Sequence, residues 1–266
     1  MNVLKSVKQT VNIYLILIKY YLCFFKPVLR KQIRNPKNIP IIINNFNQLF
    51  YLKQLINKLQ IFNIKTIVIL DNNSTFPPLL KYYEDIKNEV KIIRLTKNRG
   101  HLAFWKTEYV FKQYSSGFYV VTDPDVVPLD ICPEDLVKKL MKLSLKYKIY
   151  TKVGVSLKIN DIPDHYINKD KVLNWEKQFW QIEKSEMAFE AAIDTTFALY
   201  RPNYIYNKQN FYKALRTKKP YQAKHGGWYI NHKNLTEEEL YYNKTANSSS
   251  SWNIDKQNNT TSSMYN

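Results

Sequence analysis

The chain has 266 residues, of which 45% are hydrophobic, so it can build one large domain with a substantial core, and an intrinsically disordered chain is excluded. Forty Lys and Arg against 22 Asp and Glu give a formal net charge of +18. This excess either reflects a Lys- and Asn-rich coding bias or calls for an anionic partner: nucleic acid, an acidic membrane surface or a phosphorylated substrate. Cys23 and Cys132 lie far apart in the sequence, which excludes a disulfide framework and a cysteine metal site and favours a reducing, cytoplasmic setting.

Residues 11–25, VNIYLILIKYYLCFF, are mostly apolar, but they are fewer than the roughly 20 residues that a membrane-spanning helix needs. At about 100° per residue the polar side of a helix here collects Lys5, Lys8, Asn12, Lys19 and Lys26. We predict a basic amphipathic extension over residues 1–37, with a helix that stops near Pro27. Its residues 1–34 either attach the protein peripherally to the cytoplasmic face of an anionic membrane or dock on the domain itself.

From residue 38 onward, short apolar runs alternate with longer helical patterns. Strands are predicted over 39–46, 66–75, 90–100 and 117–125, and helices over 48–62, 79–88 and 103–114. Three alternations of strand and helix followed by a strand are typical of an α/β fold with a mostly parallel, doubly wound, Rossmann-like sheet flanked by helices. We place this domain at residues 38–242. The Ser-, Thr- and Asn-rich residues 243–266 are predicted to form a disordered tail.

Polar side chains stand at the carboxyl ends of the predicted strands, which is where open α/β sheets bind their ligands. In chain order they are Asn44, Asn45, Asn47, Asp71, Asn72, Asn73, Asn98, Arg99, His101, Asp123 and Asp125. The sequence therefore predicts a ligand site along this edge of the sheet.

The last two of these residues, Asp123 and Asp125, are separated by Pro124, which fixes part of a turn and allows both carboxylates to face one pocket. Two carboxylates suit Mg²⁺ or Mn²⁺ carried with a diphosphate, because these ions need few protein ligands and keep positions open for phosphate oxygens. Taken alone, the tripeptide favours an Asx-type turn that ends a strand. The motifs around it favour the metal site.

Five segments, taken in order, carry a resemblance to a known family: DNNST, NRGHLAFW, YVVTDPDVVP, AAIDTTFALYRP and PYQAKHGGWY. Over about residues 38–242 they resemble glycosyltransferases of the GT-A fold, of the family-2-like kind with an Asp-any-Asp motif. The resemblance implies a hexosyltransferase-like enzyme that uses Mn²⁺ or Mg²⁺. Its donor would be a nucleotide-diphospho-sugar and its acceptor a glycan or a lipid-linked molecule, in the synthesis of a surface polysaccharide or glycoconjugate.

The resemblance also implies roles for single residues. Asp123, Asp125 and His225 would hold the metal, and Asp71 and the end of the first strand would lie near the base and ribose of the donor. The donor-binding candidates as a group are Asn44, Asn47, Asp71, Asn98, Arg99, His101, Asp123 and Lys224. Arg99 and Lys224 suit neutralisation of a diphosphate.

His225 carries two readings from its residue type. A neutral imidazole is able to ligate a transition ion, and Gly226 and Gly227 permit the backbone to approach a ligand closely. An ordinary buried or turn histidine is equally compatible with the sequence.

An inverting transferase needs a carboxylate that takes the proton of the acceptor hydroxyl. Asp194 is the first candidate, because its neighbours are small and apolar and because it follows the metal motif at the distance that the resemblance implies. The alternative for Asp194 is a helix cap or a hydrogen bond to Thr196. Glu176 is the second candidate. Two threonines follow Asp194 where the family has an adjacent acidic pair, which leaves inverting or retaining stereochemistry open.

Four residues are candidates for acceptor binding. Trp175 and Trp180 are either platforms on which a sugar stacks or core residues. Asp161 and Asp164 follow a predicted strand, where they either hold acceptor hydroxyls or serve as turn residues.

Two other classes of protein compete with this interpretation. The positive charge and the many aromatic residues suit a nucleic-acid-binding protein, but the sequence has no RNP-type run, zinc-finger spacing or recognition helix, so we predict no nucleic-acid partner. A nucleotidyltransferase with two metal ions needs a third carboxylate near Asp125, and Asp130 is the only one nearby in sequence.

Overall fold

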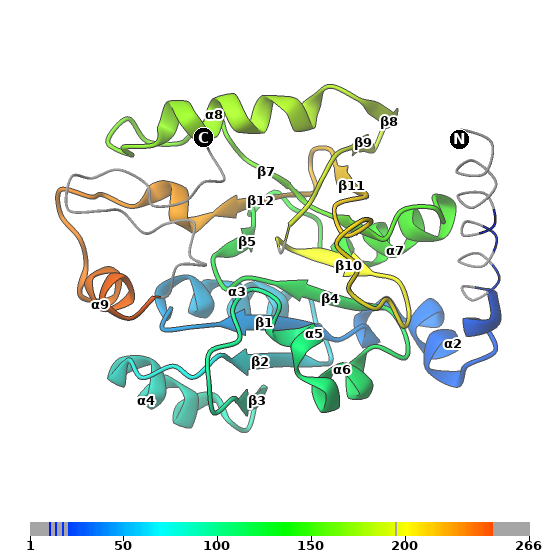
Figure 1. The fold of residues 1–266 in the computed structure, drawn as a ribbon, viewed down its shortest axis with the longest axis horizontal. Coiled ribbons are helices and arrows are strands. Elements are labelled where there is room, and N and C mark those ends of the chain that lie inside the picture. The colour runs from blue at the N-terminus through cyan, green and yellow to red at the C-terminus, as the bar shows by residue number, and fades with distance from the viewer. Residues whose placement is uncertain (1–10, 12–13, 15–17, 19–20, 195, 247–266) are drawn as a thin grey trace, which may run out of the picture.

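The computed structural model describes residues 11, 14, 18, 21–194 and 196–246. Its strands are β1 (Ile41–Asn45), β2 (Ile67–Asp71), β3 (Lys91–Arg94), β4 (Tyr119–Thr122), β5 (Val126–Pro128), β6 (Lys152–Gly154), β7 (Ser156–Leu157), β8 (Glu183–Ser185), β9 (Ala188–Glu190), β10 (Ala198–Tyr200), β11 (Ala214–Thr217) and β12 (Gln222–His225). Nine of them form one sheet in the order β3-β2-β1-β4-β10-β6-β11-β9-β8, and three form a second sheet in the order β5-β12-β7 (Figure 1).

The helices lie around these sheets. They are α2 (Pro27–Arg34), η1 (Pro36–Asn38), α3 (Phe50–Ile61), α4 (Pro77–Ile86), α5 (Ala103–Lys106), α6 (Glu108–Tyr114), α7 (Leu136–Lys146), α8 (Lys169–Glu176), η2 (Lys177–Trp180), η3 (Gly226–Tyr229) and α9 (Glu237–Thr245). None of the helices in the described part of the chain is long and apolar enough to cross a membrane.

The first four strands of the large sheet confirm the predicted alternation. β1 pairs in parallel with both β2 and β4, and β2 pairs in parallel with β3. Each of these connections passes through a helix, as a parallel pair requires. The carboxyl ends of the four strands therefore meet at one edge, as the sequence predicts.

The second half of the sheet contains two strands that run against their neighbours. β10 is antiparallel to both β4 and β6, β6 and β11 are parallel, and β9 is antiparallel to β11 and β8. Within this nine-stranded sheet, β9 and β10 thus run antiparallel to the other seven strands. The predicted mostly parallel α/β sheet flanked by helices is confirmed, and the inserted antiparallel strands are a feature that the sequence pattern did not predict.

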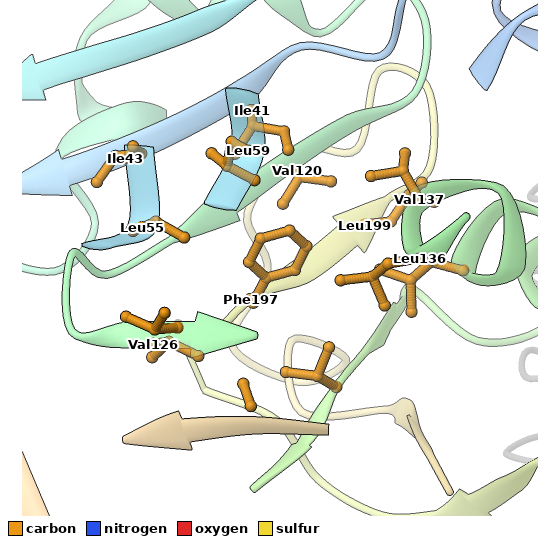
Figure 2. Close-up of a cluster of buried hydrophobic side chains, with 14 of the residues drawn as sticks. Ile41, Ile43, Leu55, Leu59, Val120, Val126, Leu136, Val137, Phe197 and Leu199 are labelled. Atoms are coloured by element: carbon orange, nitrogen blue, oxygen red, sulfur yellow. The ribbon is translucent and has the colours of Figure 1, made fainter. Parts of the chain in front are cut away.

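Both faces of the sheet are buried, which explains why its strands are continuous apolar runs. Ile41 and Ile43 of β1 pack in the cluster that includes α3, α4 and α7, whereas Ile42 packs in the cluster that includes α5 and α6. In Figure 2, Phe197 lies between the side chains of β1, α3 and β4 on one side and Val126 on the other. Burial of each such side chain stabilises the fold by about 1.5–3 kcal/mol.

Two predicted elements need correction. The helix predicted over 103–114 is two helices, because the chain leaves helical geometry at Thr107, whose hydroxyl donates to the Ala103 carbonyl at 2.8 Å. The basic stretch after residue 26, which the sequence assigned to the N-terminal extension, contains α2. This helix packs on the domain through Leu29, which is buried, and Gln32.

Described helices lie before residue 38 and extend past residue 242, the two predicted domain boundaries. α9 continues to Thr245, whose hydroxyl accepts a hydrogen bond from Asn47 Nδ2 at 2.9 Å. Most of the predicted amphipathic helix before residue 21, and the predicted tail from residue 247 onward, lie outside the described residues.

Candidate active site

Asp125 and His225 lie side by side although one hundred residues separate them in the sequence. β5 begins directly after Asp125 and pairs antiparallel with β12, so that Val126 is opposite His225. His225 Nδ1 lies 3.3 Å from Asp125 Oδ2. The backbone N–H of Gly226 donates to the main-chain oxygen of Asp125 at 2.7 Å, and the N–H of Gly227 donates to its Oδ2 at 3.2 Å. The structure therefore joins two of the three predicted metal ligands.

The imidazole of His225 is held in a buried and largely apolar environment. Its ring stacks on Trp228 with a centroid distance of 5.0 Å and an interplanar angle of 12°. Burial lowers the pKa of His225, and the negative charge of Asp125 opposes this effect. The ring is therefore neutral at neutral pH, which is the form that ligates metal ions.

Tyr51 of α3 forms another wall of this site, and sequence reasoning did not single it out. Burial raises the pKa of Tyr51 to about 12, and Asp125, Glu239 and Glu238 add to the rise, which places these carboxylates near its hydroxyl. A Cβ on Gly226 would overlap the Tyr51 ring, so the glycine permits this close approach. A tyrosine on the buried side of a predicted helix gives no signal of such a role.

The predicted metal set is assembled only in part. Asp125 and His225 are in contact, but the described residues contain no group of three or more His, Cys, Asp or Glu side chains placed to hold a metal ion. Asp123 is partly buried and stands at the end of β4, outside this pair. A carboxylate and a neutral imidazole fit a divalent ion that arrives with a diphosphate, because such an ion takes most of its ligands from phosphate and water.

Asp194 lies in the segment that leads into β10, next to β4. The pairing of Ala198 with Val121 directs this segment past the end of β4, where Asp123 stands. Burial raises the pKa of Tyr200 well above its ordinary value, and Asp194 and Asp123 both contribute to the rise, so the two carboxylates act on one hydroxyl. Asp194 Oδ1 is buried and has no hydrogen-bond partner among the described residues.

Lys152 of β6 fixes the backbone of Asp194. Its Nζ donates to the main-chain oxygen of Asp194 at 2.7 Å and to the Tyr200 hydroxyl at 3.2 Å, and it lies 3.4 Å from the centroid of the Phe211 ring. Lys152 has no exposed surface. Sequence reasoning missed this residue, and the available signal was a lysine inside an otherwise apolar strand, residues 150–157.

Glu176, the second candidate for the base, is part of a buried ion pair. Its Oε2 accepts a hydrogen bond from Arg216 Nη1 at 2.8 Å, and both side chains are buried. Arg216 also donates from Nε to the main-chain oxygen of Ala192 at 2.8 Å and lies over the Phe179 ring. Because this carboxylate is paired and has no access to solvent, we reassign Glu176 from catalysis to the support of the segment that precedes Asp194.

Two predicted donor-binding residues, Asp71 and Asn47, are fully buried and form hydrogen bonds to the loop that follows β2. Asp71 accepts hydrogen bonds from the backbone N–H of Ser74, the Tyr83 hydroxyl and Arg94 Nε, at 3.1 to 3.2 Å. Asn47 Oδ1 accepts from the backbone N–H groups of residues 75 and 76, just before α4. Neither side chain has exposed surface, so we reassign both from direct contact with a donor to the scaffold of the site.

The loop after β3 carries the other donor candidates. Asn98 Oδ1 accepts from the Gly100 N–H and from Asn72 Nδ2, each at 2.8 Å, and Asn44 Nδ2 donates to the Gly100 oxygen at 3.3 Å. The φ of Gly100 is 73°, which favours glycine there. The guanidinium of Arg99 donates to the main-chain oxygen of Lys106, and the next candidate, His101, is exposed. These contacts tie the loop to the ends of β1 and β2.

Lys224, which precedes His225 in β12, and Asp161 both contact the side chain of Tyr229. The Nζ of Lys224 is 3.6 Å from the centroid of the Tyr229 ring, and the Tyr229 hydroxyl donates to Asp161 Oδ1 at 2.6 Å. Asp161 also pairs with Lys158 at 2.7 Å. A lysine, a tyrosine and an aspartate thus form one cluster beside β12.

The remaining acceptor candidates are not gathered at the site by any contact of the described residues. Asp164 pairs with Lys169 on the surface and is fully exposed. Trp175 of α8 is 41% exposed, whereas Trp180 of η2 packs against Phe189 at a centroid distance of 5.4 Å. Trp180 is partly buried.

No family model matches the chain, and no curated protein is similar to it in sequence. Among solved structures it is similar to the mannosyltransferase PcManGT from Pyrobaculum calidifontis in complex with GDP-Man and Mn²⁺, with 12% identity, a TM-score of 0.45 and coverage of 83% of this chain and 67% of that one. It is also similar to S. aureus TarS 1–349, with 15% identity, a TM-score of 0.44 and coverage of 78% and 68%. For the same TarS fragment in complex with UDP, the values are 16%, 0.46, 70% and 60%. Likeness at this level leaves the function to be argued from the site itself.

Proposed function

We propose that this protein is a metal-dependent glycosyltransferase of the GT-A fold, which moves a sugar from a nucleotide-diphospho-sugar to a glycan or lipid-linked acceptor. The observation that carries the proposal is the contact between Asp125 and His225 at the carboxyl edge of the parallel strands, with His225 Nδ1 3.3 Å from Asp125 Oδ2. Open α/β sheets bind nucleotides at this edge. A buried carboxylate beside a neutral imidazole is a ligand set for a divalent transition ion.

Asp123, Asp125 and His225 would hold the ion. When bound, it would offset the negative charge that develops on the departing diphosphate. Lys224, one residue before His225, and Arg99, on the loop after β3, are the cationic side chains that we assign to the phosphate oxygens. Tyr51 and Trp228 pack beside the ligand pair.

We assign the proton transfer to Asp194. Asp194 is partly exposed, unlike Glu176, and its Oδ1 has no hydrogen-bond partner among the described residues, so the carboxylate is able to accept a proton from an acceptor hydroxyl. Lys152 donates to the main-chain oxygen of Asp194 and not to its Oδ1. The hydroxyl oxygen would then attack the anomeric carbon as the bond to the diphosphate breaks, which inverts the configuration.

The competing nucleotidyltransferase needs a third carboxylate beside Asp125. Asp130 does not supply it, since its side chain is fully exposed and forms an ion pair with Lys58 at 2.7 Å. Asp130 therefore serves as a control in the experiment that follows.

Calorimetric titration of UDP-sugars and GDP-sugars into the full chain, with Mn²⁺ and then with a chelator, tests the proposal. We expect binding that depends on Mn²⁺ in the wild type, loss of this binding in Asp125→Asn, and a smaller loss in Asp123→Asn. Asparagine at 125 keeps an oxygen that can accept from the Gly227 N–H, so the fold should persist. Asp130→Asn should bind as the wild type does. A wild type that binds no sugar nucleotide in Mn²⁺, or an Asp125→Asn variant with unchanged affinity, would overturn the proposal.

A further inference from the structure

The N-terminal part of the chain exposes a row of large apolar side chains. Val11, Tyr14, Ile18, Leu22 and Phe25 are between 51% and 80% exposed. Val11, Tyr14, Ile18 and Leu22 are helical, and their spacing of three or four residues places them on one face, while Phe25 follows in the turn after residue 23. We call these five residues the apolar row. Several exposed large apolar side chains that follow one another along a segment are typical of an interaction surface.

A basic hollow follows directly after the apolar row. Pro27, Arg30, Lys31 and Arg34 lie on one face of α2, and together with Asn35 and Asn38 they line a depression of about 360 Å³. Among the described residues, no carboxylate lies within 4.0 Å of the charged group of Arg30, Lys31 or Arg34. Three cations that converge on one hollow without a counter-charge constitute a site for anions.

The opposite side of this segment is fastened to the domain. Gln32 Nε2 donates to the Phe118 oxygen at 2.9 Å, and the Phe118 N–H donates to Gln32 Oε1 at 2.8 Å. Cys23 is buried and accepts a hydrogen bond from Asn203 Nδ2 at 3.4 Å. The apolar row and the basic hollow are therefore held facing outward. Figure 1 places α2 at one end of the molecule, remote from α9, which borders the candidate active site.

The charge of this region has one sign. Asp71 is the first acidic residue of the chain. The basic residues of the first 38 positions are Lys5, Lys8, Lys19, Lys26, Arg30, Lys31, Arg34 and Lys37. A partner for this surface must accordingly be anionic.

We propose that the apolar row and the basic hollow together dock on the surface of an anionic lipid bilayer. The apolar row would enter the boundary between headgroups and acyl chains, as amphipathic helices do, and the hollow would bind lipid phosphate groups. Nucleic acid fits less well, because it offers no apolar layer for the aliphatic side chains Val11, Ile18 and Leu22. A second copy fits less well, because its own basic surface would repel the first. The inference does not depend on the proposed enzymatic function.

Sedimentation of the full chain with vesicles tests this docking surface. The vesicles are phosphatidylcholine alone, or an equal mixture with phosphatidylglycerol. Removal of residues 1–34 is not used, because it would take Leu29 and Gln32 out of the domain. One variant carries Arg30→Gln, Lys31→Gln and Arg34→Gln, and a second carries Leu22→Ser and Phe25→Ser. The matched control carries Lys138→Gln, Lys142→Gln and Lys146→Gln, which removes three charges from the exposed face of α7.

We expect the wild type and the α7 control to bind the anionic vesicles and not the neutral ones. The α2 variant should bind the anionic vesicles on the order of a hundredfold more weakly. Each Lys or Arg near an anionic surface contributes a similar part of the binding free energy, and this variant removes three of them. The apolar-row variant should also bind more weakly. Failure of the wild type to bind anionic vesicles would overturn the proposal, as would an equal loss in the α7 control. If the protein forms a dimer in the absence of vesicles and Phe25→Ser dissociates this dimer, the apolar row is an interface with a second copy, and the proposal is overturned. Complete release of the vesicle-bound protein by millimolar inorganic phosphate would show a free-anion site and would likewise overturn it.

Discussion

The amine of Lys152 lies 2.7 Å from the main-chain oxygen of Asp194, a contact between two segments that sit 42 residues apart in the chain. β6 and β10 pair antiparallel with Lys152 opposite Tyr200, and the same amine donates to the Tyr200 hydroxyl at 3.2 Å. The lysine lies over the Phe211 ring and has no exposed surface, so it makes this bond in an environment that disfavours its own charge. The backbone of the candidate base thus depends on a buried titratable group.

This relationship predicts a pH dependence of stability. Burial places the pKa of Lys152 well below its ordinary value, and the charge of Asp194 opposes the effect only in part. The unfolded chain therefore binds more protons than the folded one between that lowered pKa and the unfolded value of about 10.4, and stability rises with pH across this window. We expect the free energy of unfolding of the wild type to increase with pH relative to that of Lys152→Met. Urea unfolding at a series of pH values measures this difference.

Lys142→Met is the control for this series, because Lys142 is an exposed lysine of α7. Its stability should follow that of the wild type at every pH. Buried tyrosines also titrate at alkaline pH, and taking differences between the two chains cancels their contribution. Parallel curves for the wild type and Lys152→Met would show that the amine stays charged in the folded state.

The second prediction concerns the carboxylate of Asp194. Asp194→Asn preserves the size of the side chain and leaves the main-chain oxygen that binds Lys152 unchanged, so it removes only the capacity to accept a proton. We expect unchanged donor affinity and a turnover lower by roughly 10² to 10⁴, the range typical of lost general base catalysis. The measurement is the transfer rate against pH, together with the anomeric configuration of the wild-type product.

Glu186→Gln, an exposed change in the turn between β8 and β9, should transfer at the wild-type rate. Near-normal turnover in Asp194→Asn would reject Asp194 as the base. A product that keeps the configuration of the donor would remove the need for such a base.

The sequence predicted the parts of the fold that rest on local patterns. Apolar runs such as Ile41–Ile43 are buried on both faces, and they mark the parallel strands together with the edge at which Asp123 and Asp125 stand. The burial of Asp71 and Asn47 was not predictable, because a polar residue at a strand end looks the same in sequence whether it holds a ligand or its own loop.

Contacts between residues that are distant in the sequence could not be predicted for a different reason. The pairing of β5 with β12 brings His225 to Asp125, and only the family resemblance suggested that contact. The ion pair of Glu176 with Arg216 joins residues that are 40 positions apart and belong to a helix and a strand. No periodicity or turn signal specifies such a contact, since it depends on how β10 and β11 insert into the sheet.

The third prediction tests this buried ion pair. Removal of one partner leaves an uncompensated charge or donor in the interior, so Arg216→Met and Glu176→Gln should each lower the free energy of unfolding by about 3–5 kcal/mol. The double variant should lose less than the sum of the two, because it leaves no unpaired charge. Urea unfolding of the four chains in a double-mutant cycle measures the coupling.

Glu84→Gln disrupts an exposed pair with Lys87 and should change stability by less than about 1 kcal/mol. Strictly additive losses for Glu176 and Arg216 would contradict a coupled pair. An abolished transfer rate in a folded Glu176→Gln variant, with normal donor affinity, would return this residue to the catalytic candidates.

The last prediction uses Gly154, which pairs with Ala198 where β6 meets β10. A Cβ on Gly154 would lie 2.7 Å from the Phe197 oxygen and 2.8 Å from Ile193 Cδ1, too close on both sides of the segment that carries Asp194. Gly154→Ala should therefore displace this segment, lowering the free energy of unfolding by about 1–3 kcal/mol and reducing the transfer rate. Donor affinity should fall less than the transfer rate, because Asp125 and His225 lie at the pairing of β5 with β12, and only Asp123 stands beside the displaced segment.

Gly117→Ala is the matched control, since its Cβ would crowd only the Gln32 side chain on the side of α2. It should cost a similar amount of stability and leave the transfer rate per folded molecule as it was. The two variants are compared by urea unfolding and by initial transfer rates at saturating donor. If Gly154→Ala loses stability but transfers at the rate of Gly117→Ala, the position of the segment around residue 194 does not limit the reaction, and the assignment of the base to this segment fails.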